Sequence, residues 1–182
     1  PITTRSFDEA MLSAIRERFA RAALPPSVTA ALADGYAAMQ QRARDASPLA
    51  VRSSAPAEDS AESSFAGVHD TFLDIHSLSS LESAVRRCWA SLWSERAVTY
   101  RHLHDMDSRS PTIAVVVQQM ISSDVSFVVF TSDPVNARDG HLVISASWGL
   151  GEAIVSGQVT PDHIVVSPEG EIVTYAVGKK QI

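Results

Sequence analysis

Hydrophobic residues recur at helical spacing near the start of the chain. From Phe7 to Phe19 they fall at four-residue steps, and Ser6 with Glu9 has the pattern of a capping box. The Pro25–Pro26 pair ends this predicted helix. A second helix is predicted beyond the prolines, with Ser27 as its cap. Its apolar stripe consists of Val28, Leu32, Tyr36 and Met39.

A third amphipathic helix is predicted where Ser79 and Glu82 form another capping-box pattern. One broad face of this helix is apolar and consists of Leu81, Val85, Cys88, Trp89, Leu92 and Trp93. Cys88 is the only cysteine, so the chain has neither a disulfide framework nor a cysteine-based zinc site. We expect its thiol simply to pack in the core.

From Thr112 the hydrophobic period changes to two, which is typical of a strand. Further strands are predicted at 126–131 and 141–147, joined by a turn at Asp139–Gly140. Near the end, two β-like stretches flank Ser167-Pro168-Glu169-Gly170, with proline and glycine at the second and fourth turn positions. This pattern predicts a β-hairpin.

Residues 51–75 place one arginine, a loop of small residues, a glycine and a threonine between two β-like stretches. Arg52 is predicted at a strand end, where its planar, charged guanidinium suits phosphate oxygens. Gly67 would let the main chain approach an anion, and Thr71 adds a hydroxyl as the next strand begins. The loop between them has the composition of a flap. Taken alone, these residues also fit an arginine paired with a carboxylate, a turn glycine and a capping threonine.

Gln118 stands on a predicted strand beside Met120, and its amide offers both a donor and an acceptor to an adenine or ribose. An ordinary edge-strand glutamine is the alternative. Glu58–Asp59 is not predicted to bind metal, because adjacent carboxylates on a strand point apart. Gly149-Leu150-Gly151-Glu152 lacks the third glycine of a dinucleotide fingerprint, so a tight strand-to-helix turn is predicted there. The scattered histidines suggest neither a metal site nor a catalytic base.

The composition fits one soluble domain or most of one, because 182 residues with 45% hydrophobic content can bury a substantial core. A net charge of -6 and the lack of a basic run argue against a nucleic-acid partner. The sequence has no long apolar run and no secretory pattern, so no membrane association is expected. We therefore predict a cytoplasmic protein.

Several of these segments occur together in one known family. VRSS at 51–54, FAG-x-x-x-T at 65–71, ASLW at 90–93, VVVQ-x-M at 115–120 and SWGLGEA at 147–153 keep the family's order across most of the chain. They resemble the ATP-binding domain of phosphoenolpyruvate synthase, pyruvate phosphate dikinase and rifampin phosphotransferase. The resemblance implies an α+β fold of the ATP-grasp type, of which residues 1–182 are an internal portion. Helices and the flap would occupy 1–110, and the strand-rich part would occupy 111–182.

The same resemblance implies roles for individual residues. Arg52, Gly67 and Thr71 would contact the phosphates of ATP, and Gln118 would contact the nucleotide. Mg2+ would accompany ATP, with ligands outside this chain. Enzymes of this family pass phosphate from ATP to a histidine on a separate swivelling domain and on to a small-molecule acceptor. None of this chain's histidines matches that carrier.

The chain also departs from the family. Phe127 stands where a small residue, usually glycine, is common. The family's early phosphate-binding lysine and its later magnesium-binding carboxylate and glutamine set are not in these residues. Phosphoryl transfer depends on positioning and charge stabilisation, so we expect this chain to be inactive by itself. The alternative interpretation is a non-catalytic nucleotide-binding or interaction module with a residual pocket.

Overall fold

The computed structural model describes residues 8–42, 47–55, 70–104, 106, 111–132 and 140–179. The chain divides into two compact units, Pro1–Met120 and Ile121–Ile182. The first unit contains an antiparallel sheet with several helices, and the described part of the second contains an antiparallel sheet with one short helix, so the predicted α+β class is confirmed. In the described ranges, no helix is long and apolar enough to cross a lipid bilayer.

The helices of the first unit are α1 (Glu9–Arg21), α2 (Pro26–Arg42), α3 (Leu78–Ala90), the short 3-10 helix η1 (Ser91–Trp93) and α4 (Glu95–Leu103). All of the predicted caps differ from those observed. Asp8 caps α1, since its carboxylate accepts the amide protons of Ala10 and Met11 at 3.0 and 3.4 Å. A carboxylate there also interacts favourably with the positive end of the helix dipole. The predicted cap, Ser6, lies outside the described residues, and the cap observed is Asp8 instead.

The two other caps are corrected in the same way. Helix α2 begins at Pro26, which is well suited to the first helical position, so Ser27 lies inside the helix. Ser77 caps α3 in a capping box with Ser80, two residues before the predicted pair. Several serines follow one another here, and the pattern alone did not identify which one ends the preceding loop.

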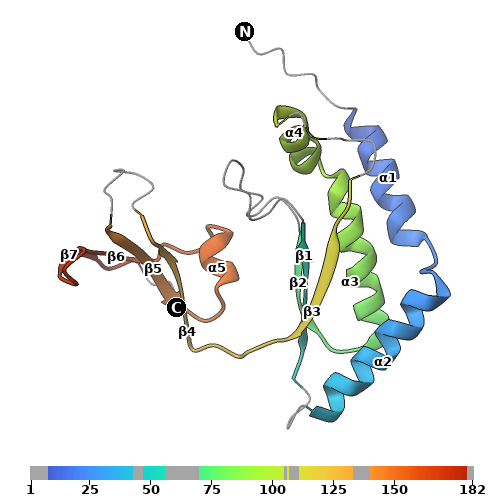
Figure 1. The fold of residues 1–182 in the computed structure, drawn as a ribbon, viewed down its shortest axis with the longest axis horizontal. Helices are drawn as coiled ribbons and strands as arrows, with labels where there is room; N and C mark the ends of the chain where they lie inside the picture. Colours follow the sequence, from blue (N-terminus) through green and yellow to red (C-terminus); the bar gives the residue numbers. More distant parts are fainter. Residues whose placement is uncertain are drawn as a thin grey trace. The chain divides into compact units, whose positions relative to one another are not determined.

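The first sheet has the strand order β2-β1-β3. Its strands are β1 (Leu49–Ser54), β2 (Thr71–Ile75) and β3 (Ala114–Gln119), and both pairings are antiparallel. Helix α3 lies against one face of this sheet, and α1 and α2 pack along α3 (Figure 1). The buried core consists of Leu49, Val51, Leu81, Ala84, Val85 and Cys88. Cys88 is fully buried, as its position on the apolar face predicted.

The second unit is a four-stranded antiparallel meander with the order β4-β5-β6-β7. It comprises β4 (Val125–Phe130), β5 (Leu142–Trp148), α5 (Glu152–Val155), β6 (Asp162–Val166) and β7 (Ile172–Ala176). The predicted hairpin is confirmed, because β6 and β7 pair across a turn in which Gly170 has a φ of 89°. The predicted strand-to-helix turn is confirmed as well, with Gly149 at a φ of 77° before α5.

Candidate nucleotide-binding site

The register of the first sheet brings three of the predicted site residues onto one face. Arg52 lies opposite Thr71 on β2 and opposite Val116 on β3, while Ala50 lies opposite Gln118. Opposite residues of an antiparallel pair point to the same side, as do residues two apart in a strand. Arg52, Thr71 and Gln118 therefore share a face, and Thr71 begins β2 as predicted.

We call Arg52, Thr71, Val116 and Gln118 the open face, because all four are exposed and no described helix covers them. The other face carries Leu49 and Val51, which are 1% and 0% exposed, against α3. The alternation predicted for β3 is confirmed: Val115 and Val117 pack against the core, while Val116 and Gln118 do not. Because of this alternation, Arg52, Thr71 and Gln118 lie on the face of the sheet opposite to the helices.

Arg52 is the fourth of the six residues of β1, so its predicted place at a strand end is wrong. The strand continues to Ser54 because β3 pairs with it along its whole length. Among the described residues, none forms an ion pair or hydrogen bond with the Arg52 guanidinium. Within the described residues, the alternative of an arginine paired with a carboxylate therefore finds no partner.

The remaining candidates lie elsewhere. Gly67, most of the predicted flap and the Glu58–Asp59 pair lie outside the described residues. Asp70 is adjacent to Thr71, yet it belongs to the other side of the strand. Its carboxylate lies 3.6 Å from the Arg96 guanidinium, so it does not neutralise Arg52. In the described part of the chain, no group of three potential metal-ligating side chains occurs.

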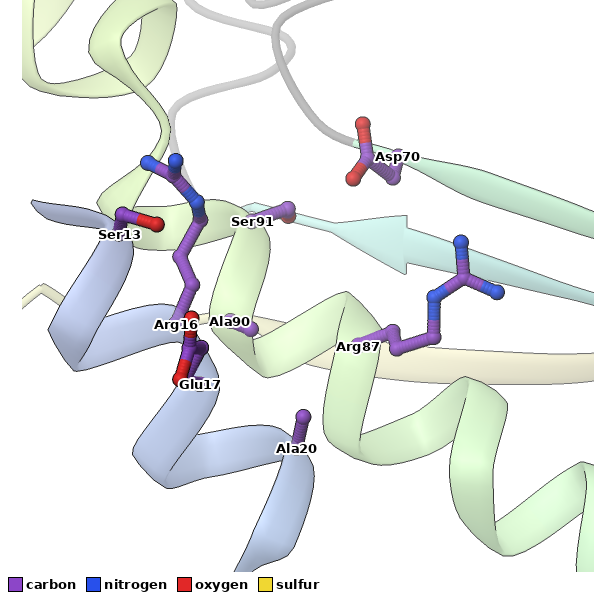
Figure 2. A pocket seen from close by; sticks show the side chains of 8 residues that line it. All are labelled: Ser13, Arg16, Glu17, Ala20, Asp70, Arg87, Ala90 and Ser91. Carbon is purple, nitrogen blue, oxygen red and sulfur yellow. The ribbon is translucent and has the colours of Figure 1, made fainter. Parts of the chain in front are cut away.

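A cleft of about 270 Å³ opens between α1 and α3, on the helix-covered side of the sheet (Figure 2). Its lining includes Arg16 and Arg87, whose guanidinium groups point in different directions (Figure 2). Arg16 donates to the Trp93 carbonyl at 2.9 Å and pairs with Glu9, and Arg87 stacks 4.2 Å from the Phe72 ring centre. Because both cations already have partners and no open-face residue lines the cleft, it is not the candidate site.

Two buried polar side chains have structural roles. Burial, reinforced by the negative charge of Asp70, raises the pKa of the Cys88 thiol to about 12, so it stays protonated and unreactive. Arg101 is 4% exposed and donates to the Leu92 carbonyl at 2.6 Å, which ties α4 to η1. Burial lowers the Arg101 pKa. No pattern in the sequence marked Arg101, because its contact depends on how α4 folds back.

The fold defines a class of protein, namely an α+β domain whose first sheet presents a guanidinium, a hydroxyl and an amide on one exposed face. The profile of the family described as "Pyruvate phosphate dikinase, AMP/ATP-binding domain" matches residues 6–182. The chain therefore belongs to that family, and its ATP-grasp-type fold and its nucleotide ligand, ATP, agree with the sequence-based prediction.

Curated relatives support this assignment. A probable phosphoenolpyruvate synthase from Pyrococcus abyssi is 41% identical over 170 residues, covering 92% of this chain and 21% of the relative. The phosphoenolpyruvate synthase of Aeropyrum pernix is 42% identical over 168 residues, covering 91% and 20%. A rifampicin phosphotransferase from Streptomyces sviceus is 41% identical over 167 residues, covering 92% and 19%. The chain thus spans about a fifth of the length of these relatives.

Proposed function

We propose that this chain binds ATP on the open face of the first sheet. Arg52 and Thr71, together with Gly67, contact the phosphates, and Gln118 contacts the base or ribose. The observation that carries this proposal is the register, which gathers Arg52, Thr71 and Gln118 on one exposed face while leaving the guanidinium without a partner among the described residues.

The chemistry of the three side chains fits this arrangement. A guanidinium grips two phosphate oxygens at once through parallel N–H donors, and its charge offsets part of the negative charge of the triphosphate. Arg52 and Thr71 are directly opposite, so their β-carbons lie about 5 Å apart, close enough to share one phosphate group. Gln118 is diagonal to Arg52, at about 7–8 Å, and its amide both donates and accepts. Mg2+, when bound, supplies further charge compensation from ligands outside this chain.

In a longer protein, this domain supplies ATP for phosphoryl transfer to a histidine on a separate swivelling domain and then to a small acceptor in the cytoplasm. The acceptor is selected outside this domain. That conclusion is supported by the equal identity of the chain to proteins named for different reactions, 41% to a probable phosphoenolpyruvate synthase and 41% to a rifampicin phosphotransferase.

Calorimetric titration with ATP tests the proposal, using both this chain and the complete gene product that contains it. Arg52→Ala is expected to weaken ATP binding about tenfold or more, equivalent to about 1.4 kcal/mol. It should leave binding of adenosine, which has no phosphates, unchanged. Arg18→Ala removes the same charge from the exposed surface of α1 and should change neither affinity.

Gln118→Ala distinguishes the contact with the base or ribose from the contact with the phosphates, since it should weaken the binding of adenosine and of ATP alike. If Arg52→Ala leaves the ATP affinity of the complete gene product unchanged, the phosphate assignment fails. Tight ATP binding without phosphorylation of any histidine in that product would instead indicate the non-catalytic nucleotide-binding module.

A further inference from the structure

Thr71 stands at the start of the five-residue strand β2, where little backbone pairing holds it in place. Among the described strands, β2 lies at one edge of the first sheet and pairs with β1 alone. At this end of β2, Thr71 and Phe72 are opposite Arg52 and Val51. The ends of edge strands open at a low cost in free energy. A hydroxyl that is to meet a phosphate without first being ordered therefore needs further contacts at this end of the strand.

Two arginines of the helical layer contact the residues on either side of Thr71. The guanidinium of Arg96, in the first turn of α4, lies 3.6 Å from the Asp70 carboxylate. The guanidinium of Arg87, in the last turn of α3, lies 4.2 Å from the centre of the Phe72 ring. Figure 2 shows Asp70 at the start of β2 and the side chain of Arg87 extending from the neighbouring helix. One contact thus precedes Thr71 and the other follows it.

These contacts lie on the side of the strand opposite to the Thr71 hydroxyl. Phe72 packs against the buried core, whereas Thr71 belongs to the open face. The buried Cys88 thiol adds a weak hydrogen bond on the same side as Phe72, since it donates to the Asp70 carbonyl oxygen at 3.7 Å. The two arginines therefore act on Thr71 through its neighbours and leave its hydroxyl open to a ligand.

We propose that Arg87 and Arg96 are positioning residues, which hold the start of β2 so that the Thr71 hydroxyl is in place when a phosphate of ATP binds. The inference rests on the proposed function, because it takes Thr71 as a phosphate ligand. The side chains of Arg96 and Asp70 are 57% and 50% exposed, so their ion pair is a weak one. Contacts of this strength change an equilibrium about two- to fivefold, which affects a fraying strand end without unfolding the unit.

Calorimetric titration of the complete gene product with ATP tests the proposal through a double-mutant cycle. Arg96→Ala and Arg87→Ala should each weaken ATP binding about two- to fivefold, and Arg96→Lys, which keeps a charge beside Asp70, should restore most of the loss. In the Thr71→Val background neither arginine variant should weaken binding further, since no hydroxyl remains to be positioned. Arg18→Ala removes an exposed charge from α1 and should have no effect in either background.

Asp70→Asn distinguishes positioning from a direct contact of Arg96 with the phosphates. This variant removes a negative charge and releases Arg96, so a guanidinium that bound phosphate itself would then bind ATP more tightly. Positioning predicts the opposite, a loss of ATP affinity of about two- to fivefold. Unchanged or tighter ATP binding by Asp70→Asn overturns the proposal, as does a full additional loss when Arg96→Ala is combined with Thr71→Val.

Hydrogen exchange without nucleotide separates a failure of this inference from a failure of the proposed function. Peptides that contain residues 70–75 should exchange about two- to fivefold faster in Arg96→Ala, while peptides from α2 should be unaffected. Unchanged exchange at the start of β2 refutes the positioning role, even if Arg52→Ala still weakens ATP binding. If exchange is faster but Thr71→Val leaves the ATP affinity unchanged, Thr71 is not a phosphate ligand, and the positioning role fails with it.

Discussion

Gly178 offers the sharpest test of the second unit, because its neighbours leave no room for a side chain. It is a buried residue that follows β7, and its amide donates to the Asp162 carboxylate at 2.7 Å. A β-carbon added there would collide with the Thr160 carbonyl oxygen and lie 2.6 Å from the Pro161 carbonyl oxygen. Both obstacles are backbone atoms, which cannot swing aside as the end of a flexible side chain can.

The cost of Gly178→Ala follows from two effects. Overpacking typically costs 1–3 kcal/mol, and a hydrogen bond to a charged group contributes about 1.5–3 kcal/mol. If the chain moves enough to relieve the clash, it also breaks the bond to Asp162. We therefore expect Gly178→Ala to destabilise the second unit by about 3–5 kcal/mol.

The control is Gly35→Ala in the middle of α2, where nothing lies within 4 Å of the added carbon. Alanine is the better helix former, so this change should stabilise the first unit by about 0.5–1 kcal/mol. Hydrogen exchange read by mass spectrometry measures both effects separately, using peptides from β6 and β7 for one and from α2 for the other. If the free energy of opening in β6 and β7 of Gly178→Ala stays within about 1 kcal/mol of that of the unchanged protein, the close approach of residue 178 to the Thr160 and Pro161 carbonyls is refuted.

Two further predictions concern the first unit. The raised pKa of Cys88 means that the folded state holds the thiol proton more tightly than the unfolded state does. The contribution of this thiol to the free energy of unfolding is therefore complete below pH 9.0 and is lost as the pH rises toward about 12, which urea unfolding across that range can follow. An unchanged free energy of unfolding across the range would contradict a buried thiol. Asp74 has a φ of 61°, which aspartate and asparagine tolerate and β-branched residues do not, so Asp74→Val should cost about 1–2 kcal/mol and Asp74→Asn almost nothing. Since the Asp74–His76 pair at 2.8 Å is exposed, equal losses in the two variants would show that the pair matters more than the backbone.

The elements themselves were largely predictable from the sequence, because their signals are local. The alternation along β3 and the turn before β7 act over a few residues, and both were predicted correctly. The helix caps were not, since several serines and an aspartate compete for the same role and tertiary packing selects among them. The chain's turn at Ser91–Trp93, which ends α3 before its apolar stripe does, was missed for the same reason.

The residue types of the candidate site could be predicted from the sequence, whereas their positions relative to one another in the sheet could not. Arg52 and Thr71 are separated by a long loop, and nothing local states that they stand directly opposite. The pairing of Arg52 with Val116, and with it the diagonal position of Gln118, depends on a contact between distant strands. The sequence also could not show that none of the described carboxylates pairs with the Arg52 guanidinium.

By itself, the sequence determined which residues alternate, where the chain turns and which family it belongs to, because each of these properties depends on short segments of neighbouring residues. Only the tertiary structure decided which strands pair and in which register, and hence which polar side chains stand together on an uncovered face. The reason is physical: a shift of one residue between β1 and β3 would turn Gln118 toward α3 and turn Val115 and Val117 away from the core, and the packing of these two valines against the core excludes it.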